Sequence, residues 1–243
     1  MDAVSTHGQN ARWRESMARY YLQFSKEGYA VYTSHLDMQR FFKRAFARAG
    51  VELAFSNGYN PHPKMSFAQP LSLGYSSRGE YLEFQTADQW QATEIKSRLQ
   101  EVMPEGISIL TVRQLPEQGK SLASMCTAAS YKIFLRWDPQ EMGCKAKDFP
   151  MRGFLDQEQI LVLKRMKKKK EPKEVDIKGK IRDIEWAAQD NIIIMSTILD
   201  AGSDSNLSPD LLIQAISRYV GHVIPPDNVE ITRMKIHLDG LDS

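Results

Sequence analysis

Two hydrophobic periodicities alternate along this chain of 243 residues, and their order restricts the fold more than any single motif. Short segments rich in aromatic and β-branched residues favour strands, whereas apolar residues spaced three and four apart favour amphipathic helices. In the first half these signals predict strands at 19–24, 51–56, 80–86 and 106–115, and helices at 34–49 and 89–104. The resulting β-α-β-β-α-β order is that of a ferredoxin-like domain.

The second half repeats this order with additional strands. Strands are expected at 130–137, 159–166, 173–181, 183–189, 191–201 and 228–238. The stretch 141–157 can hold a short helix, and a helix is expected at 208–221. A Ser-Pro start and a glycine end support that helix, and Asp190–Asn191 supports a hairpin turn. We therefore predict an α+β protein with an N-terminal extension (1–17) and two ferredoxin-like halves (18–116 and 129–239), the second with extra strands.

The helix predicted at 34–49 combines strong end signals with a basic face. Ser34 is an N-cap candidate at capping-box spacing from Asp37, and Gly50 stands where a helix-ending glycine is favoured. Four cations occupy the face opposite the apolar stripe: Arg40, Lys43, Arg44 and Arg48. Arginines one turn apart lie about 6 Å from each other, near the phosphate spacing of a nucleic-acid strand. The alternative is a solvated helix face without a ligand.

Positive charge is segregated along the sequence, although the formal net charge is only +2. Residues 12–64 hold nine Lys/Arg against four Asp/Glu, and residues 160–182 hold ten against three. The second segment contains a run of four lysines, expected at a hairpin tip: Lys167, Lys168, Lys169 and Lys170. RNA is favoured over a membrane as the partner, because no apolar helix face accompanies the run. We expect the basic helix and the lysine run to share one exposed side.

Several classes of chemistry lack support in the sequence. Two cysteines provide neither a zinc site nor an iron–sulfur cluster, and no phosphate-binding GxxxxGK[ST] or GxGxxG motif is present. There is no run of 18 apolar residues and no secretory leader, so a soluble, cytoplasmic protein is expected. We predict no cofactor and no bound metal.

The segment 55–75 is too rich in Pro, Gly and Asn for a helix or a long strand. Two prolines stiffen the chain around His62, while Tyr59 offers a ring that can stack on an unpaired base and Lys64 offers a cation. The alternative is that the segment packs onto the first sheet through its other apolar residues, Phe67, Leu71 and Leu73.

His35 and His62 are the candidate catalytic residues. Two histidines beside a basic helix can exchange protons with RNA near neutral pH. In the structural alternative, His35 bonds locally within the first helical turn, and His62 anchors the loop between its prolines.

Four short motifs occur together in the first half: Ser34–Asp37 (SHLD), Gly58–Pro63 (GYNPHP), Phe67–Leu71 (FAQPL) and Gly79–Tyr81 (GEY). In these motifs, and more loosely across 19–238, the chain resembles the radical-SAM-linked domain family of bacteria. Members of that family are encoded beside, or fused behind, a radical-SAM protein. The resemblance therefore implies a radical-SAM partner that carries the iron–sulfur cluster, and an RNA or ribosome context. It implies no catalytic residue.

These observations predict an RNA-binding accessory subunit that presents RNA or a ribosome-associated substrate to a radical-SAM partner. The expected RNA contacts are the basic helix face, Tyr59, Lys64 and the lysine run. Two alternatives remain open. One is a metal-independent RNA-processing enzyme that uses His35 or His62, and the other is a protein-interaction adaptor that does not bind RNA.

Overall fold

Two α+β units make up the chain, as the α+β prediction requires. The computed structural model describes residues 17–164 and 172–241, and the units comprise residues 1–124 and 125–243. Among the described helices, none is long and apolar enough to cross a membrane.

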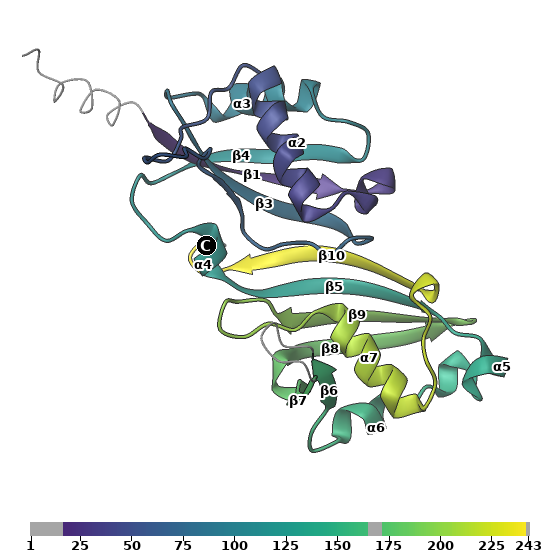
Figure 1. The fold of residues 1–243 in the computed structure, drawn as a ribbon. Helices are drawn as coiled ribbons and strands as arrows, with labels where there is room; N and C mark the ends of the chain where they lie inside the picture. Colours follow the sequence, from purple (N-terminus) through teal and green to yellow (C-terminus); the bar gives the residue numbers. More distant parts are fainter. Residues whose placement is uncertain (1–16, 165–171, 242–243) are drawn as a thin grey trace, which may run out of the picture. The chain divides into compact units, whose positions relative to one another are not determined.

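Unit 1 is an antiparallel sheet in the order β4-β1-β3-β2. Its strands are β1 (Ala18–Lys26), β2 (Met65–Phe67), β3 (Ser76–Thr86) and β4 (Ile107–Leu115). A 3-10 turn, η1 (Gly28–Tyr32), leads into helix α2 (His35–Arg48), and α3 (Ala92–Glu101) connects β3 to β4. Both helices pack against the same face of the sheet (Figure 1) because their apolar stripes join one core.

Alternate residues of β1 contribute to the core of unit 1. Tyr20, Leu22 and Phe24 point to the helix side and are almost fully buried. The ring of Phe24 lies 4.9 Å from that of Phe42 on α2, measured between centroids, in an edge-to-face contact. Such aromatic pairs add to the burial of apolar area, so Phe42 anchors the middle of α2 to the sheet.

The opposite face of the unit 1 sheet carries an ion pair. Arg19 Nε and Glu83 Oε1 are 2.7 Å apart, and both side chains are largely buried. Arg19 also donates to the Lys120 carbonyl at 2.6 Å, and the Leu122 amide donates to Glu83 at 2.8 Å. The segment after β4 is therefore bound to this face of the sheet by charged side chains.

Unit 2 is built on antiparallel strands in the order β10-β5-β9-β8. Its strands are β5 (Cys126–Arg136), β8 (Ile181–Gln189), β9 (Ile192–Asp200) and β10 (Val229–Leu238). Helix α7 (Pro209–Val220) lies along one face (Figure 1), with Leu212 and Ile216 fully buried. The hairpin of β6 (Leu161–Lys164) and β7 (Lys173–Asp176) is the predicted addition to this half.

Short helices complete the connections. They are α4 (Leu122–Met125), α5 (Pro139–Met142), η2 (Ala146–Asp148), α6 (Met151–Asp156), η3 (Lys178–Lys180) and η4 (Pro226–Asn228).

The strand predicted at 51–56 is wrong. That segment makes only two isolated bridges, Leu53 to Thr86 and Phe55 to Pro63, and the second strand of unit 1 is instead β2. The Lys64 carbonyl accepts a hydrogen bond from the Gln85 amide, and Met65 then pairs with Phe84. The residues that follow the proline-rich loop thus pair along β3 as a strand, whereas those that precede it contact only its last two residues, Gln85 and Thr86.

Candidate nucleic-acid interface

Helix α2 begins and ends where its local signals predict. The Ser34 hydroxyl accepts a hydrogen bond from the Asp37 amide at 3.2 Å and donates one to the Asp37 carboxylate at 2.7 Å. After the last helical turn Gly50 has a φ of 68°, a left-handed conformation that glycine adopts without steric cost. These two ends fix which side chains face the core and which face solvent.

The predicted basic residues of α2 are all exposed. We call Arg40, Lys43, Arg44 and Arg48 the basic face. Arg40 pairs with Asp37 at 3.2 Å, with both side chains largely in solvent. For the other three cations, no carboxylate of the described residues lies within ion-pair distance. Three positive charges of this helix are therefore available to an external anion.

The groups around Asp37 lower the pKa of its carboxyl. The hydrogen bond from Ser34 lowers the pKa of this carboxyl most, and the hydrogen bond from Arg40 and the charges of Arg40 and Arg44 lower it further. Burial acts in the opposite direction and is outweighed. Asp37 thus stays ionised and neutralises Arg40, at one end of the face.

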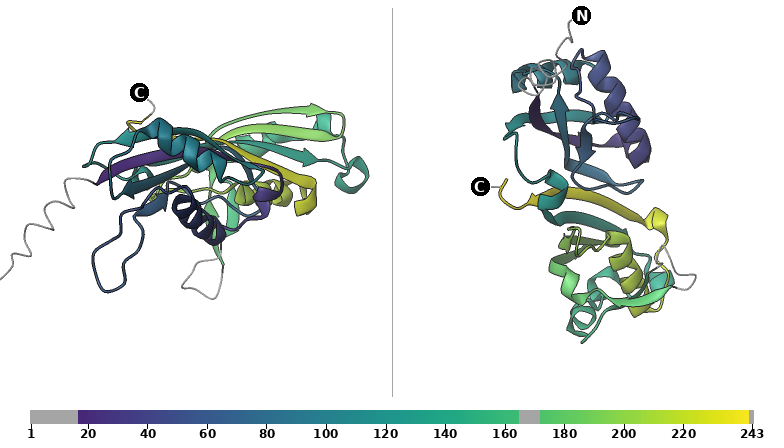
Figure 2. Two further views of the ribbon diagram at one scale, coloured as in Figure 1. Left: turned by 90° about the horizontal axis from the view of Figure 1, so that it is seen from above. Right: turned by 60° about the vertical axis from the view of Figure 1, so that its left-hand side comes forward.

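The loop between α2 and β2 stands out from unit 1 as a dark blue arch (Figure 2, left). Its base is closed by hydrogen bonds, because the Ser56 amide donates to the His62 carbonyl at 2.8 Å and the His62 amide donates to Ser56 Oγ at 3.0 Å. Tyr59, at the tip, is fully exposed. The loop therefore has a fixed base and presents an aromatic ring to solvent.

A groove of about 390 Å³ lies between α2 and the base of this loop. Its walls include Lys43 and Ala47 from the helix, Phe55 and Pro63 from the loop, and Glu52. The floor consists of three buried residues, Phe46, Val51 and Leu53. The groove joins the basic face to the proline-rich loop, which are distant in sequence. Sequence patterns gave no sign of it, because its walls come from segments with no shared periodicity.

His35 lies in the first turn of α2, where local bonding was the structural alternative. Its Nε2 is 3.1 Å from Gln39 Nε2, and its ring contacts Phe67 edge-to-face, with centroids 5.2 Å apart. Burial lowers the pKa of His35, the Glu80 carboxylate partly opposes this effect, and Lys26 adds to it. His35 is therefore neutral at pH 7.

A cavity beside His35 is too small for a nucleotide. Its volume is about 20 Å³, enough for roughly one water molecule. Lys26 and Glu80 also line it and are almost fully buried. The Lys26 ammonium donates to the carbonyls of Val31 and Thr33, so it holds the turn that precedes α2.

The two candidate histidines lie apart. His62 is exposed beside Pro63, which lines the groove next to the second half of α2. His35 is at the start of the same helix, about 12 Å of helix rise before Lys43. Among the described residues, no hydrogen bond joins the two imidazole rings. No group of three His, Cys, Asp or Glu residues in the described chain is arranged to hold a metal ion.

The remaining predicted contacts have different positions. Lys64 is half-buried, and its ammonium lies 3.9 Å from Met17 Sδ. Phe67 packs into the core against Phe24 and Phe42, as the packing alternative requires, whereas Leu73 is exposed and does not pack. The run Lys167, Lys168, Lys169 and Lys170 lies outside the described residues. Its placement on the same side as the basic face stays a prediction.

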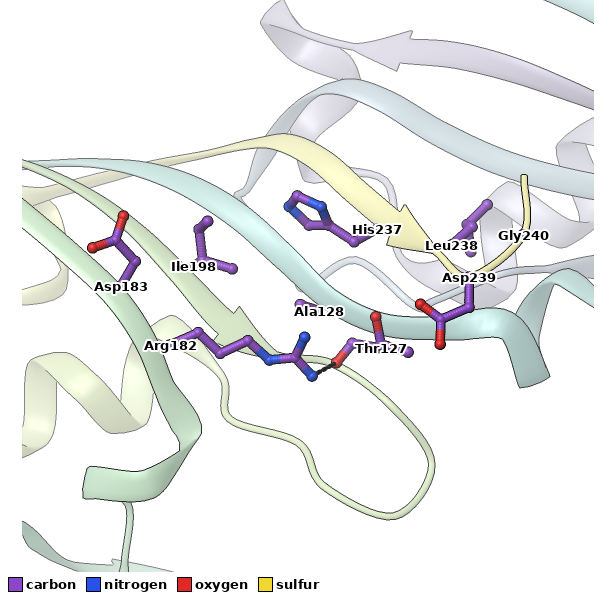
Figure 3. A pocket seen from close by; sticks show the side chains of 9 residues that line it. All are labelled: Thr127, Ala128, Arg182, Asp183, Ile198, His237, Leu238, Asp239 and Gly240. Atoms are coloured by element: carbon purple, nitrogen blue, oxygen red, sulfur yellow. Dashed lines mark hydrogen bonds between the residues drawn. The ribbon is translucent and has the colours of Figure 1, made fainter. Parts of the chain in front are cut away.

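Unit 2 contains an open hollow of about 550 Å³ (Figure 3). Arg182 lies on its floor and donates to the Thr127 carbonyl at 2.8 Å and to Asp200 at 2.6 Å. Burial raises the pKa of Asp200, but hydrogen bonds from Ser205 and Arg182 and the arginine charge outweigh it, so the pKa is lowered. The guanidinium is thus engaged in holding the strands, which makes this hollow a weaker candidate than the unit 1 groove.

No curated protein matches this chain in sequence. Among solved structures, a chain of "Crystal Structure of a Cbf5-Nop10-Gar1 Complex" is 13% identical with a TM-score of 0.44 and covers 90% of this chain. This chain spans half the length of that one. A chain of "Crystal Structure of an Unknown Protein from Galdieria sulphuraria" is 10% identical with a TM-score of 0.26, with 91% of this chain and 98% of that chain covered. Neither likeness carries a functional argument.

Residues 19–209 match a family described as "Uncharacterized protein conserved in bacteria (DUF2344)". This match covers most of unit 1 and much of unit 2, including the basic face, the proline-rich loop and the groove between them. The chain therefore belongs to this conserved bacterial family.

Proposed function

We propose that this protein is an RNA-binding accessory subunit that presents RNA or a ribosome-associated substrate to a radical-SAM partner. The observation that carries the proposal is the set of three exposed cations on α2, Lys43, Arg44 and Arg48, without carboxylate partners in the described chain. They stand beside a loop that exposes Tyr59. Cations that track a phosphate backbone and aromatic rings on which bases stack are the two components of single-strand binding.

We also propose that both units are ferredoxin-like, a reading that the order of their strands supports. In each unit the last strand of the β-α-β-β-α-β series lies beside the first strand, in the orders β4-β1-β3-β2 and β10-β5-β9-β8. All neighbours are antiparallel within each unit. Fold alone does not assign function, so the proposal depends on the surface of α2.

The salt dependence of RNA binding tests the proposal. Fluorescence anisotropy with a labelled single-stranded oligoribonucleotide is measured between about 50 and 200 mM salt. Each phosphate contact to a single strand contributes roughly 0.7 to the slope of log affinity against log salt, so substituting three cations lowers the slope by about 2. The test variant is Lys43→Ala/Arg44→Ala/Arg48→Ala.

The matched control is Arg113→Ala, which removes an exposed arginine of β4 in the same unit. We expect the control to keep the wild-type affinity and slope. If the wild-type protein has no affinity for RNA at low salt, or if the triple variant keeps the full slope, the basic face is not a phosphate-binding surface.

A specific observation also favours the adaptor function as a second candidate. Four large apolar residues are exposed around the start of α2: Tyr29, Tyr32, Leu36 and Leu73. The Gly74 amide donates to the Val31 carbonyl at 2.9 Å, which brings Leu73 to this cluster. Tyrosine and leucine side chains exposed together are typical of protein contact surfaces. Co-purification with the radical-SAM protein that is lost in Tyr32→Ala/Leu36→Ala, together with absence of RNA binding, would favour the adaptor.

The enzyme alternative has a direct test. Purified protein is incubated with cellular RNA in the presence of a chelator, and the RNA is examined for cleavage. We expect intact RNA, because the cavity beside His35, which Lys26 and Glu80 also line, has a volume of only about 20 Å³ and is too small for a nucleotide. Cleavage that is lost in His35→Ala or in His62→Ala would establish the enzyme instead.

A further inference from the structure

The groove between α2 and the loop base differs from the rest of the basic surface, because it is mostly apolar. Phe46, Val51 and Leu53 form a buried floor, and Phe55 leaves 49% of its surface exposed at the edge. No aromatic ring of the described residues packs on Phe55. A free aromatic face inside a groove is available for stacking.

The groove is held in place by the backbone. The Val51 amide donates to the Phe46 carbonyl at 3.0 Å and the Ala54 amide donates to the Gln85 carbonyl at 2.8 Å. Phe55 and Pro63 are joined by a β-bridge on the other side. Because these bonds are already made without a ligand, little conformational entropy is lost on binding.

Charge and size identify the occupant. Lys43 belongs both to the groove and to the basic face, so a nucleotide whose phosphate lies on Lys43 has its base directed toward the groove. The volume of about 390 Å³ lies at the lower end of the range of small-molecule sites. We propose that the groove binds one unpaired nucleobase of a single-stranded RNA, stacked on Phe55, an inference that rests on the proposed RNA-binding function.

The one carboxylate of the groove adds selectivity. Glu52 is exposed and lines the wall that also carries Phe55, and no cation of the described chain pairs with it. A carboxylate accepts hydrogen bonds and donates none. It therefore favours adenine, cytosine and guanine, which carry amino groups, over uracil, whose single ring N–H lies between two carbonyl oxygens.

Affinity for single-stranded RNA and for a blunt RNA duplex of equal length distinguishes this groove from the basic face. In Phe55→Ala, affinity for the single strand falls by about 5- to 150-fold, the range for loss of one base stack, while affinity for the duplex and the salt slope are unaffected. Phe55→Tyr keeps an aromatic face and retains the affinity. Leu110→Ala, which removes an exposed apolar side chain of β4, is the matched control and binds as the wild type does.

Base selectivity gives a second readout. The wild-type protein binds an oligo(C) better than an oligo(U) of the same length, and Glu52→Gln reduces that preference. Equal wild-type affinities for the two oligomers overturn the role of Glu52.

These experiments distinguish failure of the base site from failure of the RNA-binding function. If the wild-type protein binds RNA and Phe55→Ala binds the single strand equally well, the base site is wrong while the RNA-binding function stands. If Phe55→Ala instead loses only a protein partner, the groove binds a peptide and the inference is overturned. If no RNA binds to the wild-type protein at all, the proposed function fails, and the base site with it.

Discussion

Replacing Arg19 by methionine tests whether the segment after β4 is held to unit 1 by charge. The guanidinium pairs with Glu83 at 2.7 Å and donates to the carbonyls of Lys120 at 2.6 Å and Pro116 at 3.4 Å. The Arg19 side chain is 7% exposed and that of Glu83 is 13% exposed. The Arg19→Met substitution keeps most of the aliphatic volume but leaves the Glu83 carboxylate buried without its cation.

The magnitude follows from that geometry. Removing one partner of a buried ion pair costs about 3 to 5 kcal/mol of the free energy of unfolding. The lower end applies here, because Glu83 retains some exposure and still accepts the Leu122 amide at 2.8 Å. Loss of the hydrogen bond to the Lys120 carbonyl adds about 1 kcal/mol. We expect a total of about 4 kcal/mol.

The double variant Arg19→Met/Glu83→Leu separates charge from packing. It removes both charges, so it is less destabilised than the sum of the two single variants, with a coupling of about 2 kcal/mol. Urea denaturation followed by far-ultraviolet circular dichroism measures the three free energies. Limited trypsin digestion at exposed Lys120 reports detachment of the segment, which we expect in Arg19→Met and in the double variant, because both lack the bond from Arg19 to the Lys120 carbonyl. A loss below about 1 kcal/mol in Arg19→Met, or strict additivity in the double variant, would refute the electrostatic explanation.

Three further predictions concern single residues. Burial lowers the folded-state pKa of His35, so the contribution of this residue to stability is full above about pH 6.5 and declines as the pH falls below that value. In urea denaturation at pH 7.5 and 5.5, we expect the midpoint of His35→Gln to decline less between the two pH values than that of the wild type. Equal declines in the two proteins would contradict this prediction. The lowered pKa of Asp200 contributes stability above about pH 4 that is lost on further acidification. In thermal melts we expect Asp200→Asn to have a lower Tm than the wild type at pH 6 and the same Tm near pH 3. A Tm difference that does not change with pH would count against the hydrogen bonds from Arg182 and Ser205. In urea denaturation we expect Gly106→Ala to lose about 1 to 3 kcal/mol of the free energy of unfolding, because φ at this position is 87° and a Cβ atom would lie 2.4 Å from the Glu27 carbonyl oxygen. An unchanged midpoint would show that the backbone of the turn adapts to the added methyl group.

Local signals predicted α2 well because they act within a few residues. Ser34 and Asp37 form the N-terminal hydrogen bonds that their spacing indicates, and Gly50 adopts the left-handed conformation that ends the helix. The hydrophobic stripe also assigned the faces correctly, since Met38 and Phe42 are buried and Arg44 is exposed.

The second strand of unit 1 could not be predicted in this way. The segment at 51–56 has the composition of a strand, whereas β2 at 65–67 is only three residues long and follows two prolines. What selects β2 is the edge of β3, where Met65 pairs with Phe84 and Phe67 pairs with Leu82. A pairing between segments this far apart depends on tertiary context, which outweighs local strand propensity.

The candidate site was predicted in part for the same reason. The basic face was evident from one helix, but the groove needs Lys43, Glu52 and Pro63 to meet, and only the folded loop brings them together. A role of His35 or His62 in RNA chemistry stays a prediction. The structure places His35 in the first turn of α2 and His62 in the loop that follows this helix.

The nine Lys/Arg of residues 12–64 contribute equally to the charge of this segment, but they have different roles in the structure. Arg19 and Lys26 are buried and bind carboxylate or carbonyl groups of unit 1, so they are unavailable to a ligand. Lys43, Arg44 and Arg48 lie on the side of α2 that the core does not use. Substituting these three therefore changes affinity without a matching loss of stability, whereas substituting Arg19 does the reverse. If both substitutions instead lowered stability and RNA affinity together, the separation between the binding surface and the framework of unit 1 would not hold.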